Sequence, residues 1–256
     1  MASQIAAQLF TLRESCKDIT GIAQSLQKVR QIGYEAVQVS GFGPADAKDV
    51  AKALSDNGLA CCSTHMGWQR FTEDFDALVA DHQLWKCTHP AIGGMPKEFR
   101  TAEGIAKFAP MANEVGKKLA EHGMDFSYHN HNFEFVRHGG KTLLEMLYDL
   151  TDPRYVKAEI DTHWVQAGGG DPAAWVLKYA GRMPILHLKD MVMNPEGSGQ
   201  RFAEVGEGNL NWPAILDAAK AAKVQWYCVE QDDCYGRDPF ESLKVSLDNL
   251  HKLGLK

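Results

Sequence analysis

The chain lacks the apolar segments that would place a protein in or across a membrane. Nowhere do about 18 consecutive apolar residues occur, the length that a helix needs to span a bilayer. The first residues also lack the basic segment and the apolar core of a signal peptide. We therefore expect a cytoplasmic protein without a membrane partner.

Basic runs and paired cysteines are also missing. Lys and Arg number 27 against 33 Asp and Glu, which gives a net charge of −6 at pH 7. Binding to nucleic acid needs a basic face, so we expect no nucleic-acid partner. The six cysteines show no C-x-x-C spacing. This favours buried free thiols in a reducing compartment over a secreted disulfide scaffold.

The chain does contain short apolar runs that alternate regularly with segments of helical periodicity. The alternation has no linker or low-complexity break, and it predicts a single (β/α)8 TIM barrel that spans residues 1–256 as one domain. A doubly wound open sheet is the alternative, but no G-x-G-x-x-G follows the first strand. The eight predicted strands are Ile5–Thr11, Tyr34–Ser40, Leu59–His65, His82–Thr88, Met124–Glu134, Val156–Asp161, Pro184–Leu188 and Val224–Glu230.

The fifth predicted strand carries an unusual group of polar residues. His129, His131 and Glu134 lie within six positions, and in a strand the two histidines point to the same face. Two imidazoles with a carboxylate just beyond them are unfavourable in an apolar core. They suit a metal ion or a polyhydroxy substrate.

Polar residues also end other strands of the predicted barrel. Because the carboxyl ends of barrel strands meet at one mouth, these side chains are expected to converge there. Each one alone has an ordinary explanation as a helix cap or a structural histidine. So many histidines and acids on one rim would be electrostatically costly without a cation. Besides the fifth strand, the residues are His65, Asp161, His163, His187, Lys189, Asp190, Glu230, Asp232 and Asp233.

Asp161, His187 and Glu230 form the clearest part of this set, because each directly follows an apolar run. Carboxylates with imidazole and without thiolate suit Mn²⁺, Mg²⁺, Co²⁺ or Zn²⁺ in an open site. The sequence predicts a divalent metal cofactor but does not choose among these ions.

Five ordered motifs together resemble the xylose-isomerase-like TIM-barrel superfamily, in particular its sugar phosphate isomerase/epimerase type. The resemblance covers nearly the whole chain, and the superfamily is also distantly similar to endonuclease IV. The motifs are YHNHNFEF (128–135), EIDTHW (159–164), ILHLKD (185–190), VGEGNLNW (205–212) and YCVEQD (227–232).

The resemblance implies that Asp161, His187 and Glu230 hold a divalent metal ion. The fourth ligand of such enzymes is normally a glutamate from the fifth strand, but that place falls here on Tyr128 or His129. Either His129 takes the ligand role or Glu134 reaches back, and the other is then free to act on the substrate. This departure puts a mechanism with two opposed, metal-bound glutamate bases in doubt.

Other residues of the motifs are expected to contact the substrate. His163 and Lys189 are predicted substrate contacts, and Lys189 could neutralise an enolate or hold a hydroxyl. His65 could cover the mouth from the third strand. Trp68 and Trp164 could stack on a sugar face.

These residues predict an enzyme that removes the proton α to a carbonyl and holds a metal-bound enediolate. Glu230, or His131 from the fifth strand, would be the base. Reprotonation gives a sugar or keto-sugar isomerase or epimerase, which we favour slightly because that class is broader, although the histidine-rich fifth strand fits the lyases somewhat better. Loss of a β-substituent on the same site gives a lyase of the inosose dehydratase or 3-keto-glycoside type.

Two further functions are less favoured, a metal-dependent phosphodiesterase of the endonuclease IV type and a non-catalytic sugar-binding barrel. The expected partner is a small sugar or cyclitol. The oligomeric state stays open, with a homo-oligomer among the options.

Overall fold

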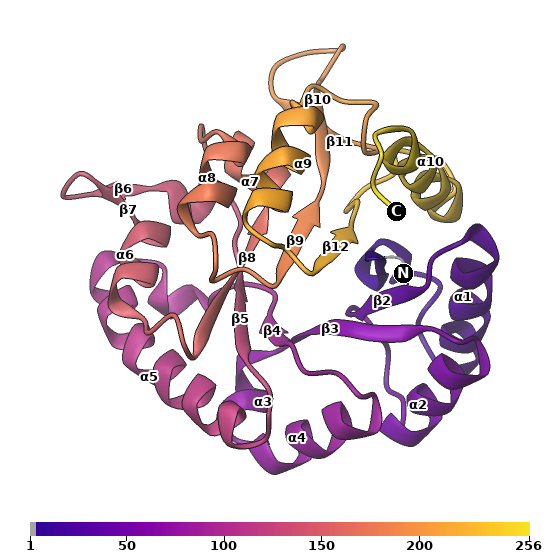
Figure 1. Ribbon diagram of the computed structural model, residues 1–256, viewed down its shortest axis with the longest axis horizontal. Coiled ribbons are helices and arrows are strands. Elements are labelled where there is room, and N and C mark those ends of the chain that lie inside the picture. The colour runs from indigo at the N-terminus through magenta and orange to yellow at the C-terminus, as the bar shows by residue number, and fades with distance from the viewer. Residues whose placement is uncertain (1–3) are drawn as a thin grey trace.

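A computed structural model describes residues 4–256, in which eight parallel strands close into a barrel (Figure 1). Around the barrel the strands stand in chain order, and β1 closes against β12. The predicted (β/α)8 barrel is confirmed, although the predicted span also includes residues 1–3, which lie outside the described range. The barrel strands are β1 (Ile5–Gln8), β2 (Ala36–Val39), β3 (Ala60–Met66), β4 (Pro90–Ile92), β5 (Phe126–His129), β8 (Val156–Asp161), β9 (Ile185–Leu188) and β12 (Trp226–Val229).

Helices surround the barrel on its outside (Figure 1). Capping side chains fix where several of them begin: Asp18 accepts a hydrogen bond from the Gly21 amide, and Thr142 forms a capping box with Glu145. The helices are α1 (Ile19–Ile32), α2 (Ala47–Asp56), α3 (Trp68–Thr72), α4 (Phe75–Leu84), α5 (Ala102–Glu121), α6 (Leu143–Leu150), α7 (Thr162–Ala167), α8 (Pro172–Lys178), α9 (Trp212–Ala221) and α10 (Pro239–Lys252).

The fourth strand lies later in the chain than predicted. The predicted strand His82–Thr88 begins inside α4, and the observed strand β4 is Pro90–Ile92. His82 is buried on the helix face that packs against the barrel, where its Nδ1 lies 2.7 Å from the Leu78 carbonyl and its Nε2 lies 2.8 Å from the Thr64 hydroxyl. The spacing of four residues from Leu78 to His82 is the helical period, so the prediction of a strand there was wrong.

β1 and β5 end well before their predicted ends. β1 ends at Gln8, because a 3₁₀ turn (Leu9–Leu12) follows it. β5 ends at His129, and the chain then bends into a second 3₁₀ turn (Phe133–Phe135). The bend is held by Glu134, whose carboxylate accepts a hydrogen bond from the His131 amide at 2.9 Å. His129 and His131 therefore do not share one strand face, although their ring centroids lie 5.1 Å apart.

The interior of the barrel contains an apolar layer and a polar layer. The apolar layer is a cluster of small and aliphatic side chains against which Trp226 packs, made of Ala6, Ala36, Cys62, Ile185 and Cys228. The polar layer lies closer to the carboxyl ends of the strands and is joined by hydrogen bonds among Gln8, Gln38, Ser63, His65, Glu159 and His187. Inward-facing residues alternate along each strand, so the same strands supply both layers.

Two antiparallel hairpins extend from loops of the barrel (Figure 1). One pairs β6 (Arg137–His138) with β7 (Lys141–Thr142), and the other pairs β10 (Asp190–Met193) with β11 (Gln200–Ala203). The second hairpin continues directly from the end of β9, so it stands beside the mouth of the barrel.

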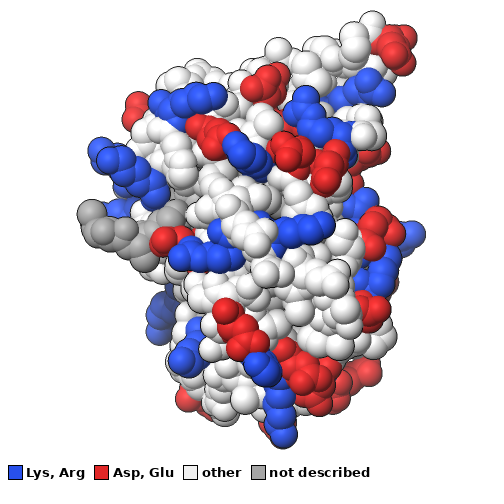
Figure 2. Space-filling view, turned by 90° about the vertical axis from the view of Figure 1, so that its right-hand side faces the viewer, with Lys and Arg blue, Asp and Glu red and all other residues white. Residues whose placement is uncertain are grey.

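The charges on the surface and the state of the cysteines agree with what the composition predicted. On the face seen in Figure 2, Lys and Arg side chains are intermingled with Asp and Glu. All six cysteines are free thiols and five of them are buried, as predicted. No helix within residues 4–256 has both the length and the apolar character needed to cross a bilayer.

Candidate active site at the barrel mouth

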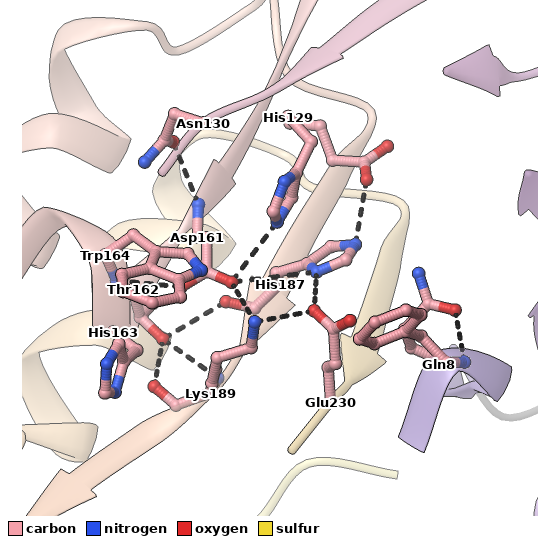
Figure 3. Close-up of polar contacts among 12 residues, drawn as sticks. Gln8, His129, Asn130, Asp161, Thr162, His163, Trp164, His187, Lys189 and Glu230 are labelled. Carbon is pink, nitrogen blue, oxygen red and sulfur yellow. Dashed lines mark hydrogen bonds and ion pairs between the residues drawn. The ribbon is translucent and has the colours of Figure 1, made fainter. Parts of the chain in front are cut away.

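Four buried side chains meet at the mouth of the barrel (Figure 3). They are His129, Asp161, His187 and Glu230, and their potential ligand atoms all lie within 4.8 Å of one another. His129 Nε2 lies 3.2 Å from Asp161 Oδ2, and His187 Nδ1 lies 3.1 Å from Glu230 Oε2. The structure thus brings together the four residues predicted as metal ligands.

Strand pairing brings these side chains close together. Asp161 pairs with His187 across β8 and β9, and Glu230 directly follows β12, whose Cys228 pairs with His187. Asp161 Oδ1 caps α7 by accepting a hydrogen bond from the Trp164 amide at 2.9 Å. The cap uses one carboxylate oxygen, and the other, Oδ2, faces His129.

Lys189 is almost completely buried beside this group. Its Nζ lies 2.8 Å from Glu230 and 3.2 Å from Asp161 (Figure 3). It also lies 3.2 Å from Asp232. Burial by itself would lower the pKa of Lys189, but these three carboxylates, Asp161 first, raise it above its usual value. The ammonium therefore stays charged within the site.

The four-residue group has the donor chemistry that a divalent cation requires. Its two carboxylates and two imidazoles include no thiolate, a set that suits the ions predicted from the sequence. The Lys189 ammonium already lies against Asp161 and Glu230, so the site accommodates positive charge there. These residues could hold a metal ion.

The protonation states of the group follow from burial and from its ion pairs. Burial alone would raise the pKa values of Asp161 and Glu230, but Lys189 and the neighbouring imidazoles hold both well below their usual range. For His187, burial is outweighed by Glu159 and then Glu230, which raise its pKa to about 10. Burial and the nearby His187 lower the pKa of His129 to about 4. The two carboxylates are therefore ionised and available as ligands.

A cavity of about 720 Å³ opens above the group. This volume suits a sugar or cyclitol, since pockets for small molecules commonly measure about 300–1,000 Å³. Of the predicted site residues, the cavity is lined by His65, Trp68, His129, His131, Lys189 and Glu230.

His131 lies at the wall of this cavity, and Glu134 lies behind it. Burial, followed by the positive environment of His129 and Lys189, lowers the pKa of His131 to about 3, so its ring is neutral. Glu134 is fully buried and accepts hydrogen bonds from the Tyr128 hydroxyl at 2.7 Å and from the His131 amide. Burial raises the pKa of Glu134 to about 7. The structure therefore brings His129, and not Glu134, into the four-residue group.

His163 and Trp164 lie beside Lys189 and do not line the cavity. The His163 ring stacks on Phe202 at 4.4 Å, and its Nδ1 lies 3.1 Å from the Asp190 carbonyl. Trp164 lies under the Lys189 ammonium, whose Nζ is 5.4 Å from the ring centroid. Trp164 thus contacts the Lys189 side chain directly, and His163 stacks on Phe202, whose ring centroid lies 5.7 Å from Lys189 Nζ.

Asp190 organises the loop after β10 and β11, a role that sequence reasoning did not assign to it. Its carboxylate accepts hydrogen bonds from the amides of Gly206, Gly208 and Leu210 and from Trp212 Nε1. Gly208 is required there, because a Cβ at this position would lie 2.3 Å from Asp190 Oδ1. The VGEGNLNW motif thus forms a ring of donors around one buried carboxylate.

Sequence reasoning also missed Glu159 and Gln38, and it placed Asp232 at the mouth without assigning it a role. Glu159 is fully buried below the four-residue group and contacts both His65 and His187. A signal for it was present, since Glu159 precedes Asp161 by two residues and so shares its strand face. Asp232 lines the cavity, and burial followed by repulsion from Glu230 raises its pKa to about 6.

Comparison with known proteins places this chain in a family. A sequence model of the xylose isomerase-like TIM barrel matches residues 26–252. The chain is 23% identical over 266 residues to an inosose dehydratase of Mesomycoplasma hyopneumoniae, covering 90% of this chain and 88% of that protein. It is 24% identical over 271 residues to the rhizopine catabolism protein MocC of Rhizobium meliloti, covering 91% and 82% of the two chains.

Solved structures share the fold. A sugar phosphate isomerase/epimerase from Parabacteroides distasonis superposes with a TM-score of 0.81 at 24% identity, covering 98% of this chain and 94% of that one. An L-ribulose 3-epimerase superposes with a TM-score of 0.75 at 15% identity, covering 98% and 94% of the two chains. At these identities the likeness shows the barrel and not the reaction.

Proposed function

Because the chain belongs to the xylose isomerase-like TIM barrel family, we propose that it is a divalent-metal-dependent enzyme that removes the proton α to the ketone of a small sugar or cyclitol. We further propose that water is then lost from the neighbouring carbon, which makes the enzyme a lyase of the dehydratase type. The supporting observation is that three groups able to transfer protons line the cavity and differ in chemistry. They are the imidazole of His131, the ammonium of Lys189 and the carboxyl group of Asp232. Such a set suits elimination, in which one group takes a proton and another gives one.

The metal-holding residues would be His129, Asp161, His187 and Glu230. When bound, the ion would polarise the substrate carbonyl and an adjacent hydroxyl, which lowers the cost of removing the α-proton. His129 stands where a glutamate is expected in epimerases of this type. Of the two opposed glutamates expected in such epimerases, only Glu230 is present here. This favours a reaction that needs a single base.

His131 is the proposed base. Its imidazole is neutral and lines the cavity, and its backbone is held by Glu134 through the amide hydrogen bond. Negative charge that develops on the substrate raises the proton affinity of a nearby imidazole, so His131 becomes a better base as the C–H bond breaks. Glu230, the other candidate base, is engaged with His187 and Lys189 and is assigned to the metal.

Elimination then requires a proton donor at the leaving oxygen. The electron pair of the broken C–H bond forms the new carbon–carbon double bond, the β C–O bond breaks, and the leaving oxygen takes a proton to become water. Asp232 is the proposed donor, because its raised pKa of about 6 keeps part of the population protonated near neutral pH. Lys189 lies 3.2 Å from both Asp232 oxygens and would stabilise negative charge on the substrate oxygen.

Isomerisation or epimerisation is the second candidate, in which the proton returns to carbon instead of water being lost. It is supported by the resemblance of the sequence motifs to the sugar phosphate isomerase/epimerase type. On either reaction His65 and Trp68 would contact the substrate from the cavity wall. His163 and Trp164 would act by holding Lys189.

The two outcomes are separated by incubating the metal-loaded protein with inososes and keto-sugars in deuterated water. We expect exchange of the α-proton, followed by a product lighter by one water, detected by NMR and mass spectrometry. His131→Asn should retain metal binding and lose the exchange. A product that keeps all its oxygen atoms and differs in mass only by incorporated deuterium would assign isomerisation, and an absence of exchange with every ketone would contradict both candidates.

A further inference from the structure

Glu159 is a fully buried carboxylate in the barrel interior that the proposed proton transfers do not use. It precedes Asp161 by two residues on β8 and faces the interior below it. Glu159 Oε1 lies 2.8 Å from His187 Nε2 and 2.5 Å from His65 Nε2, and it accepts a hydrogen bond from Gln38 Nε2 at 2.9 Å. Its other oxygen has no hydrogen-bond partner among residues 4–256. A buried carboxylate is costly, so its partners indicate why it is there.

The two nitrogens of His187 face different layers of the barrel. Nδ1 points to the mouth, 3.1 Å from Glu230 and 3.8 Å from Asp161 (Figure 3). Nε2 points down into the polar layer, where Glu159 Oε1 and Gln38 Oε1 lie at 2.8 and 2.7 Å. The tautomer of His187 therefore decides which layer receives the ring nitrogen lone pair.

The orientation of the Gln38 amide is fixed by its own neighbours. Gln38 Nε2 donates to the Ser63 hydroxyl at 3.0 Å and to Glu159, while Gln38 Oε1 accepts from Gln8 Nε2 at 2.7 Å. Both groups that face His187 Nε2 are therefore acceptors. Nε2 must therefore keep its proton, so when the ring becomes neutral it loses the proton from Nδ1, and the lone pair then lies toward the mouth.

The same residues do not make a second metal site. His65, Glu159 and His187 also form a compact group of potential ligands. However, their ligand atoms stand 2.5 and 2.8 Å apart, which are hydrogen-bond distances. Ligands about 2.0–2.1 Å from a tetrahedral ion are roughly 3.3 Å from one another, so an ion would not fit between these atoms.

His65 is held in the matching tautomer. Gln8 Nε2 lies 3.2 Å from His65 Nδ1 and can only donate, so Nδ1 accepts and Nε2 donates to Glu159. Gly93 allows the ring to lie there, because a Cβ at residue 93 would come within 3.0 Å of it. Two imidazoles and one amide thus donate to a single carboxylate.

We propose that Glu159, assisted by Gln38, is a positioning residue that keeps His187 in its Nε2–H tautomer and directs the Nδ1 lone pair toward the ion-holding group. This inference rests on the proposed function, because it presumes that His129, Asp161, His187 and Glu230 hold a divalent ion. A carboxylate can orient a metal-ligating histidine by accepting the proton of its other ring nitrogen. Replacing such a carboxylate commonly weakens metal binding by about 10–100-fold.

The experiment compares Zn²⁺ affinity and the His187 tautomer in four proteins. Titration calorimetry on the metal-free wild type, Glu159→Leu, Glu159→Gln and Ser127→Ala gives the affinities. We expect Glu159→Leu to bind Zn²⁺ about 10–100-fold more weakly than the wild type. Glu159→Gln should lose less, since its amide oxygen can still accept the Nε2 proton.

Ser127→Ala is the matched control. Ser127 precedes His129 by two residues on β5, as Glu159 precedes Asp161, and it is equally buried. Its hydroxyl has no hydrogen-bond partner within the described chain, residues 4–256. Wild-type affinity is expected for this variant.

Long-range ¹H–¹⁵N correlations of the Zn²⁺-loaded protein report the tautomer without reference to activity. We expect the wild type to show His187 protonated at Nε2, and Glu159→Leu to lose this uniform state. A wild type that binds no divalent ion contradicts the proposed function. A wild type that binds Zn²⁺ with His187 protonated at Nδ1, or a Glu159→Leu variant of unchanged affinity and tautomer, overturns the role of Glu159 alone. If Glu159→Leu does not fold, the role of Glu159 is still tested by two measurements. These are the tautomer of His187 in the wild type and the Zn²⁺ affinity of Glu159→Gln.

Discussion

The apolar and polar layers of the barrel interior are built from the same strands and yet differ completely in chemistry. β9 contributes Ile185 to the apolar layer and His187, two residues later, to the polar layer. β12 likewise contributes Cys228 and then, just beyond its end, Glu230. All four side chains are buried. Burial alone therefore does not distinguish the part of the barrel that holds it together from the part that can act on a substrate.

The two layers differ in the free-energy change that accompanies the removal of their side chains from water. Side chains of the apolar layer gain stability simply by leaving water. Side chains of the polar layer and of the mouth lose hydration and must be stabilised by one another, as Glu159 is by two imidazoles and Lys189 is by three carboxylates. We infer that changes in the apolar layer mainly alter stability, whereas changes in the polar layer and at the mouth mainly alter metal binding and turnover.

The largest effect is expected from Asp161→Asn. The amide removes one of two carboxylates from the four-residue group but can still cap α7 through the Trp164 amide. Metal binding and turnover should be lost while the barrel still folds. Calorimetric titration with Mn²⁺ or Zn²⁺ and circular dichroism check this result. Full metal affinity in this variant would mean that the ligands are wrongly assigned.

Ile185→Ala tests the apolar layer. Ile185 is completely buried, and its truncation should lower the free energy of unfolding by about 2–5 kcal/mol because it leaves a cavity. Urea denaturation measures the loss. Metal affinity should stay at the wild-type value, and a large fall in it would break the proposed separation of the two layers.

The pH dependence of stability should come from the polar layer. In the metal-free protein the pKa of His187 is raised to about 10 from an ordinary value near 6.5. Between these values the folded state binds more protons than the unfolded chain. The stabilisation is thus complete below pH 6.5 and is lost as the pH rises toward 10.

His187→Asn isolates this contribution. Between pH 6.5 and 9 the wild type should lose about 3 kcal/mol more of its free energy of unfolding than the variant does. Ile185→Ala should retain the wild-type slope, because the substitution removes no ionisable group. Urea denaturation at both pH values measures the slopes, and equal slopes in wild type and His187→Asn would contradict the assignment.

Much of the fold and of the four-residue group could be predicted from the sequence. The alternation of apolar runs and helical segments predicted the barrel, and polar residues directly after apolar runs predicted Asp161, His187 and Glu230 as a group. The structure supplies what one-dimensional patterns could not. His82 was placed in a strand because a short apolar run fits either element, and only its packing against Thr64 distinguishes them.

The sequence also could not predict the positions of some residues around the site. Glu134 follows two histidines in the sequence, yet it turns away to Tyr128 and leaves His129 in the group. Lys189 appeared as a rim residue, yet it is buried between three carboxylates that come from different parts of the chain.

The sequence by itself determined which residues end the strands, because the period of two along a strand and the apolar runs before each polar residue are local properties. Only the tertiary structure decided which of these residues touch. Closing the barrel sets the register between strands, and that register puts His187 Nδ1 beside Glu230 and His187 Nε2 beside Glu159. The direction in which each donor and acceptor points depends on this closure. It cannot be deduced from the spacing of residues along the chain.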